Sequence, residues 1–151
     1  MESLEPLVAA HPVFKSLDPS HTKLIVGCAS NAVFEQDDFV FREGEEANVF
    51  YLIRQGHVVI ETYSPEKGTI GIQTCRDGDV VGWSWLIPPY RWRFDARALQ
   101  RTRLIAIDGK CLRTKCDQDH NLGYQMMRIF TEVISERLDA TRMQLLDFYA
   151  R

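Results

Sequence analysis

The sequence lacks both a long apolar run and an excess of positive charge. Its 151 residues carry 18 Lys and Arg against 21 Asp and Glu, a formal net charge of -3. Crossing a bilayer takes about 20 apolar residues, and no segment approaches that length. Lys and Arg supply most non-specific nucleic-acid affinity, so direct DNA binding is disfavoured. The N-terminus, with Glu2 and Glu5, does not resemble a secretory signal, and we expect a cytoplasmic protein without membrane attachment.

Cysteine is also sparse. The four cysteines are Cys28, Cys75, Cys111 and Cys116, and they include no Cys-x-x-Cys pair. This spacing predicts neither a zinc site nor a disulfide framework, so we expect reduced structural thiols. A haem or iron–sulfur sensor would need an axial ligand or grouped cysteines, and the lone pair at 111 and 116 disfavours that class.

Helical and strand-type patterns divide the chain into three parts. Residues 1–30 contain Pro12 and Asp18-Pro19, which indicates two short helices, the second with Asp18 as N-cap and Pro19 at its first position. Residues 31–108 carry short β-branched and aromatic segments separated by turn signals, a pattern typical of a jelly roll or barrel. Residues 109–151 return to a helical period. With 45% hydrophobic residues, the chain suffices for one α+β domain over 1–151.

The expected elements are specific. Strands are predicted at 33–34, 39–41, 49–53, 58–60, 69–74, 96–98 and 103–107. Residues 121–149 contain no proline and predict one long helix. Its apolar stripe steps by three or four residues: Met127, Phe130, Ile134, Leu138, Thr141, Leu145 and Phe148. A stripe longer than a small barrel covers favours a homodimer through this helix, while packing on its own barrel and N-terminal helices is the alternative.

An ordered glycine framework is the most informative pattern in the chain. It runs through Arg42-Glu43-Gly44-Glu45-Glu46-Ala47, Tyr51-Leu52-Ile53, Gly56-His57-Val58, Gly68, Gly78-Asp79-Val80-Val81-Gly82, Leu86 and Ala98. In these residues the chain resembles the cyclic nucleotide-binding domain, the sensor module of the catabolite activator protein family, of cyclic-nucleotide-dependent kinases and of gated channels. The resemblance implies a double-stranded β-helix, or jelly-roll β-barrel, flanked by N-terminal helices and a long C-terminal helix. It also implies a non-enzymatic regulatory module of signal transduction that binds a cyclic nucleotide or another small anion.

The resemblance places a phosphate cradle at Gly82-Trp83-Ser84, where the first amides of a short helix would face an anion. Trp83 stands where cyclic-nucleotide binders usually have a glutamate that accepts a hydrogen bond from the ribose 2′-hydroxyl. An indole donates one hydrogen bond and accepts none. We therefore expect the ribose contact to be lost and the cAMP specificity to be altered or lost.

The family's phosphate-binding arginine falls in the loop 87–96, which is one residue shorter than the family pattern. Counted from Gly82, Arg93 takes its place; counted back from the following strand, Trp92 does. Arg91 is also within reach. A guanidinium suits a phosphate or a carboxylate, while the alternative is that both arginines are solvated loop charges stacked on aromatic rings.

Further candidates come from the strands and the terminal helix. By resemblance, Ile60, Ile72 and Gln73 lie on pocket-lining strands. Arg137-Leu138 followed by Thr141 resembles the segment whose threonine reaches the purine amino group; an interface threonine is the alternative, and Arg142 is a second polar candidate. The candidate ligand-binding residues are thus Ile60, Ile72, Gln73, Gly82, Trp83, Ser84, Arg91, Arg93, Thr141 and Arg142.

The tryptophans Trp83, Trp85 and Trp92, with Tyr90 and Phe94, form a dense aromatic cluster. Such a cluster is either a stacking surface for a planar ligand or a plug that fills the barrel.

Two other functions remain open. A ligand-free module that dimerises through the long helix fits the same stripe. A cupin-like metalloenzyme would need clustered ligands, but the barrel segment holds only His57, and we expect no metal and no catalysis. The family's helix-turn-helix would follow the terminal helix, beyond Arg151, so we expect a protein partner or a downstream domain to supply the output.

Overall fold

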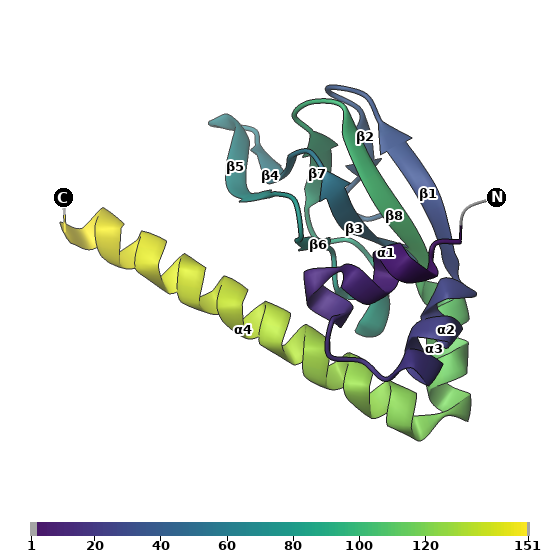
Figure 1. The fold of residues 1–151 in the computed structure, drawn as a ribbon. Helices are drawn as coiled ribbons and strands as arrows, with labels where there is room; N and C mark the ends of the chain where they lie inside the picture. The colour runs from purple at the N-terminus through teal and green to yellow at the C-terminus, as the bar shows by residue number, and fades with distance from the viewer. Residues whose placement is uncertain (1–2, 151) are drawn as a thin grey trace.

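The computed structural model describes residues 3–150 and has the predicted architecture, an antiparallel jelly roll of eight strands flanked by helices (Figure 1). The N-terminal helices are α1 (Glu5–Ala10), η1 (Pro12–Phe14) and α2 (Pro19–Val26). The strands are β1 (Ala29–Phe34), β2 (Phe39–Phe41), β3 (Val49–Gln55), β4 (Val58–Ser64), β5 (Gly68–Cys75), β6 (Val80–Val81), β7 (Asp95–Ala98) and β8 (Thr102–Asp108). A one-turn helix η2 (Ser84–Leu86) follows β6, and α3 (Gly109–Gln118) and α4 (His120–Ala150) complete the chain.

The helix signals in the N-terminal segment are confirmed, with one shift. Asp18 is the N-cap residue of α2 and Pro19 is its first residue. The fixed φ of proline suits that position, where no intrahelical partner for an N–H is needed. β1 begins at Ala29, within the segment predicted to be helical, because its backbone pairs with β8 from Ala29 onward.

Two four-stranded sheets form the roll, in the orders β1-β8-β3-β6 and β2-β7-β4-β5. Every pairing between these strands is antiparallel. Gly56 turns the chain from β3 into β4 with a φ of 136°, where the Thr102 side chain fills the space that a Cβ would need. Only glycine combines that backbone conformation with so close a neighbour.

The hydrophobic core has two parts. Inside the roll, the buried side chains include Phe41, Ile53 and Trp92. Between the roll and the helices, a second cluster joins Phe14, Phe50 and Trp85 with residues of α3 and α4. The helices therefore pack on one side of the roll, and the side chains inside the roll pack mainly against one another.

His11 fastens the N-terminal segment to β3. Its ring is 6% exposed, its Nδ1 accepts a hydrogen bond from the Val13 N–H at 3.3 Å, and its Nε2 lies 3.3 Å from the Ile53 carbonyl oxygen. Burial lowers the pKa of His11, outweighing the Ile53 hydrogen bond and the Asp79 charge that raise it. A neutral ring with its proton on Nε2 satisfies both contacts.

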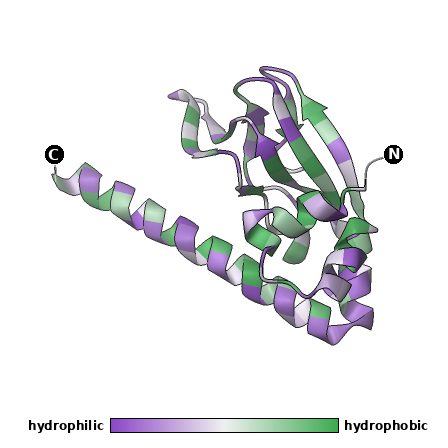
Figure 2. Ribbon diagram, viewed as in Figure 1, coloured by the Kyte–Doolittle hydropathy of each residue, from purple (hydrophilic) through white to green (hydrophobic). Residues whose placement is uncertain are grey.

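The prediction of one long C-terminal helix is confirmed by α4, which runs across the base of the molecule and continues past the roll (Figure 1). Only its first half is anchored in the core, through Leu122, Met126, Ile129 and Phe130. Hydrophobic stretches alternate with hydrophilic ones along its outer half (Figure 2). Beyond Leu138, the side chains of α4 lie exposed to solvent.

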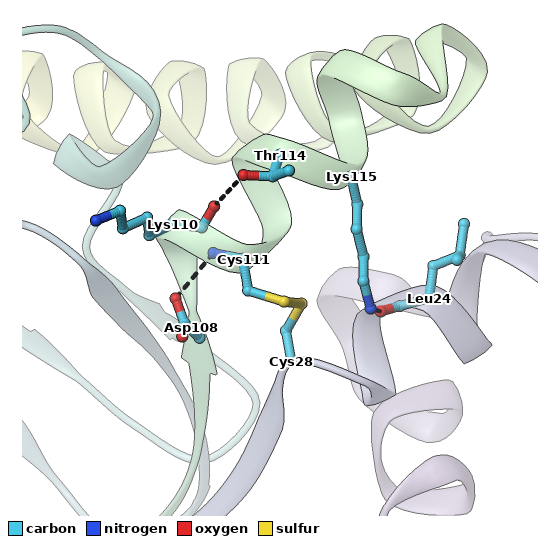
Figure 3. The surroundings of a disulfide bond; sticks show 7 residues. All are labelled: Leu24, Cys28, Asp108, Lys110, Cys111, Thr114 and Lys115. Atoms are coloured by element: carbon cyan, nitrogen blue, oxygen red, sulfur yellow. Dashed lines mark hydrogen bonds between the residues drawn. A yellow bond between two sulfur atoms is a disulfide. The ribbon is translucent and has the colours of Figure 1, made fainter.

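The expectation of four reduced thiols is wrong for two cysteines. Cys28, between α2 and β1, forms a disulfide with Cys111 in α3 (Figure 3). The spacing concealed the pair because 83 positions separate the two residues along the chain. Beside the disulfide, the Lys115 ammonium of α3 donates to the Leu24 carbonyl oxygen of α2 at 2.7 Å, a second link between α3 and the N-terminal segment. Cys75 and Cys116 are free thiols.

Candidate functional site

A cavity of about 400 Å³ lies between the roll and α4. Its walls come from β2, β4, β5, β6, the segment around η2, the loop before β7, and α4. Eight of the ten candidate residues line it: Ile60, Ile72, Gln73, Gly82, Trp83, Ser84, Arg93 and Thr141. The fold thus gathers them around one space, while their binding of a ligand stays a prediction.

The other two candidates, Arg91 and Arg142, do not line the cavity. Arg91 donates from Nη1 to the Gly44 carbonyl oxygen at 3.1 Å and lies 4.0 Å from a Glu46 oxygen, on an isolated β-bridge. Arg142 pairs with Asp139 at 3.8 Å on an exposed face of α4. Both guanidiniums are solvated surface charges, which is the alternative that the sequence left open for Arg91.

Trp92 and Arg93 both line the cavity but differ in burial. Trp92 is 5% exposed and stacks on Phe41, with ring centroids 3.8 Å apart. Arg93 is exposed and lines the cavity. The count from Gly82 assigns Arg93 to the place of the phosphate-binding arginine, and that role stays a prediction.

The aromatic cluster serves three purposes rather than one. Trp85 is fully buried outside the cavity, stacked on Phe50 at 4.6 Å and meeting Phe130 edge-on at 5.3 Å. Trp92 forms the floor of the cavity, and Trp83 lines its wall half-buried. The plug interpretation therefore holds for Trp92, and a stacking surface for a planar ligand is left to Trp83 and Phe94.

Gly82 connects the cavity floor to η2. Its φ is 93°, and the Trp92 ring occupies the space of a Cβ at this position. The chain then enters η2 with Trp83 as its N-cap residue. The expected short helix is a single 3-10 turn, in which the N–H groups of Leu86 and Ile87 bond back to Trp83 and Ser84. Among residues 3–150, the amides of Trp83 and Ser84 have no hydrogen-bond partner.

The charge of the cavity wall is one-sided. Within the described chain its lining contains two guanidiniums, Arg93 and Arg137, and no carboxylate. The apolar remainder includes Ile60, Ile72 and Ile134. Two guanidiniums against an apolar wall suit a small anion with a planar or apolar body.

Sequence reasoning did not select Arg137 as a site residue. Its Nη2 lies 3.8 Å from Asp79 Oδ2 and 3.7 Å from Cys75 Sγ. When the Gln73 amide oxygen faces the guanidinium, it lies 2.7 Å from Nη2 and 2.8 Å from Nε. The available signal was helical spacing, since Arg137 stands one turn before Thr141 on the same face.

Two neighbours of Arg137 have defined chemistry. Burial raises the pKa of Cys75 to about 11, which keeps this thiol protonated and unreactive at neutral pH. The Thr141 hydroxyl donates to the Arg137 carbonyl oxygen at 2.9 Å. That bond uses its proton and leaves the oxygen as an acceptor, the role that a purine amino group requires.

Among residues 3–150, no group of three or more His, Cys, Asp and Glu side chains is arranged to hold a metal ion. No helix there has the length and apolarity to span a membrane.

A curated relative from Rhodopseudomonas palustris, described as a potassium channel protein, is 28% identical over 124 residues. The match covers 82% of this chain but only 29% of that protein, so the chain spans less than a third of its length.

The solved structures agree on the fold. The structure of a Geobacter metallireducens protein, described as cyclic nucleotide-binding, has a TM-score of 0.81 and 27% identity, covering 91% of this chain and 99% of that one. The regulatory domain of Toxoplasma gondii PKA, crystallised with cAMP, has a TM-score of 0.71 and 16% identity, covering 87% and 48%. The model of the cyclic nucleotide-binding domain matches residues 32–119. The chain belongs to the cyclic nucleotide-binding domain family.

Proposed function

We propose that residues 1–151 form one non-enzymatic regulatory module that binds a small anionic ligand in the cavity and no longer recognises the ribose of cAMP. The observation that carries this proposal is that Arg93 and Trp83 both line the cavity, while no carboxylate does. The Arg93 guanidinium can donate hydrogen bonds to an anion, and Trp83 offers no acceptor for a sugar hydroxyl. Ligand binding therefore requires an anionic group but no ribose.

The relatives support a cyclic phosphate as the anionic group. One is described as cyclic nucleotide-binding, and another was crystallised with cAMP. Trp83 and Ser84, whose amides are unpartnered, line the same cavity as Arg93, and three such donor groups suit the several acceptor oxygens of a phosphate.

The cavity also suggests how binding is signalled. Ile134, Leu138 and Thr141 of α4 share its wall with the strands. A ligand seated there contacts the roll and the helix together, so it favours the helix arrangement that it contacts best. The ligand cavity and the partner-binding surface of α4 are then thermodynamically linked. A partner that binds α4 must therefore in turn change the affinity for the ligand.

A thermal-shift screen with cyclic mononucleotides, cyclic dinucleotides and organic acids tests the proposal. A bound ligand raises the melting temperature because it stabilises the folded state by RT ln(1 + [L]/Kd). We expect Arg93→Ala to weaken binding of the active compound about tenfold or more, because a charge-assisted hydrogen bond is lost. Arg91→Ala removes the same charge two residues away and serves as the matched control. A cAMP shift as large in Arg93→Ala as in the wild type contradicts this assignment.

We also propose that the exposed end of α4 pairs with a second copy of the chain, as an alternative role independent of any ligand. Leu138, Leu145 and Phe148 are 48%, 55% and 70% exposed, and all three belong to the apolar stripe. Such a row on an unsupported helix matches a coiled-coil seam. In this alternative, the protein is a ligand-free module that dimerises and does not respond to small molecules.

Sedimentation velocity tests the pairing. The wild type should sediment as a dimer, and Leu145→Glu should dissociate it at micromolar concentration because it places a charge in the seam. Gln144→Glu adds the same charge outside the stripe and should leave the dimer intact. A monomeric wild type, or equal dissociation by both variants, contradicts the proposed seam.

A further inference from the structure

Arg137 lies between two cavities. It lines the ligand cavity of about 400 Å³ and a second cavity of about 310 Å³ between η1 and α4. Val80 is the other residue common to both linings. The second cavity also exposes Asp79, the carboxylate that pairs with Arg137. The guanidinium therefore has an anionic partner on one side and the proposed anion site on the other.

The contacts of Arg137 are unusual for α4. Among residues 3–150, it is the one α4 side chain that makes a polar contact with the roll, through Asp79, Cys75 and the Gln73 amide oxygen. The other ion pairs and side-chain donations of α4, such as Arg142 with Asp139 and Thr141 with Arg137, stay within the helix. Asp79 is the one carboxylate among the partners of Arg137 in the roll, so loss of its contact would leave Arg137 held to the roll only by the uncharged side chains of Cys75 and Gln73.

We propose that Arg137 is a latch: it holds α4 to Asp79, and an anion in the ligand cavity opens it by taking the guanidinium. The inference rests on the proposed function. Its physical basis is competition, because one guanidinium face that satisfies a phosphate has fewer donors for a carboxylate. The Asp79 pair is the weaker competitor, since its atoms are 3.8 Å apart and its side chains are 24% and 40% exposed.

Two variants separate the latch from a plain structural contact. Asp79→Asn removes the competing charge and keeps an oxygen for the Arg76 N–H, which Asp79 now accepts at 2.8 Å. With cAMP and 2′-deoxy-cAMP as probes in isothermal titration calorimetry, we expect this variant to bind about two- to fivefold tighter. Arg137→Gln should bind about tenfold weaker. Arg142→Gln, on the same helix, should match the wild type.

Hydrogen exchange of the amides between residues 134 and 141 provides a readout without ligand. Asp79→Asn and Arg137→Gln should both exchange several-fold faster there than Arg142→Gln, because both open the latch. Unchanged exchange in both variants, or weaker binding by Asp79→Asn, overturns the latch and leaves the proposed anion site standing. If neither probe binds any variant, the proposed function fails for cyclic phosphates, and the anion-driven opening falls with it.

Discussion

Trp83→Glu is expected to create a preference for cAMP over 2′-deoxy-cAMP of about tenfold or more. Glutamate accepts a hydrogen bond from the 2′-hydroxyl, and a hydrogen bond to a charged acceptor contributes about 1.5–3 kcal/mol. The wild type should bind the two compounds with nearly equal affinity, because the lining of its cavity offers no carboxylate to the sugar. Competition calorimetry with both compounds on both proteins measures the two ratios.

Two further substitutions show whether acceptance is the cause. Trp83→Gln supplies a neutral acceptor and should give a smaller preference, since neutral hydrogen bonds contribute only about 0.5–1.5 kcal/mol. Trp83→Phe removes the indole N–H without adding an acceptor and should give none. A wild type that already discriminates tenfold against the deoxy compound would mean that another group holds the ribose.

Loss of the Cys28–Cys111 disulfide is expected to lower the free energy of unfolding by about 2–5 kcal/mol. The bond closes a long loop, because its cysteines are 83 positions apart, and therefore removes many conformations from the unfolded chain. For a domain of this size, each kcal/mol corresponds to about 2–4 °C, so Cys28→Ser with Cys111→Ser should melt roughly 10 °C below the wild type. Thermal unfolding followed by circular dichroism measures the difference.

Reduction of the wild type with dithiothreitol should reproduce that loss, and the double variant should not respond to the reagent. Cys116→Ser, which removes a free thiol from the same helix, should retain the full redox response. Thiol titration of the unfolded, unreduced wild type should find two thiols. Four would contradict the disulfide.

The sequence predicted the roll because its signals are local. Gly56 and Gly82 adopt positive φ, and β-branched runs between such glycines occupy the expected strands. Proximity across the chain was less accessible. Nothing near Arg137 in the sequence indicates Asp79 as its partner, and nothing near Cys28 indicates Cys111.

The site shows the same division. Trp92 and Arg93 both line the cavity, but the first is buried and the second exposed, and Trp83 and Trp85, two positions apart, lie in different environments. The amino-acid composition reveals such an aromatic cluster but does not tell in which directions its side chains point. Those directions depend on the turn at η2 and on the bridge that holds the loop against Glu46.

The packing beneath Gly82 has a consequence for how this domain diversifies. There the Trp92 ring occupies the place of a Cβ and stacks on Phe41, so substitution of the glycine disturbs folding before it alters recognition. At the rim, Trp83 is half-buried and Arg93 is exposed, and neither is confined in that way. Ligand preference can therefore change through substitution of rim residues such as Trp83 and Arg93. The packing beneath Gly82 stays the same, so such substitutions cost little stability.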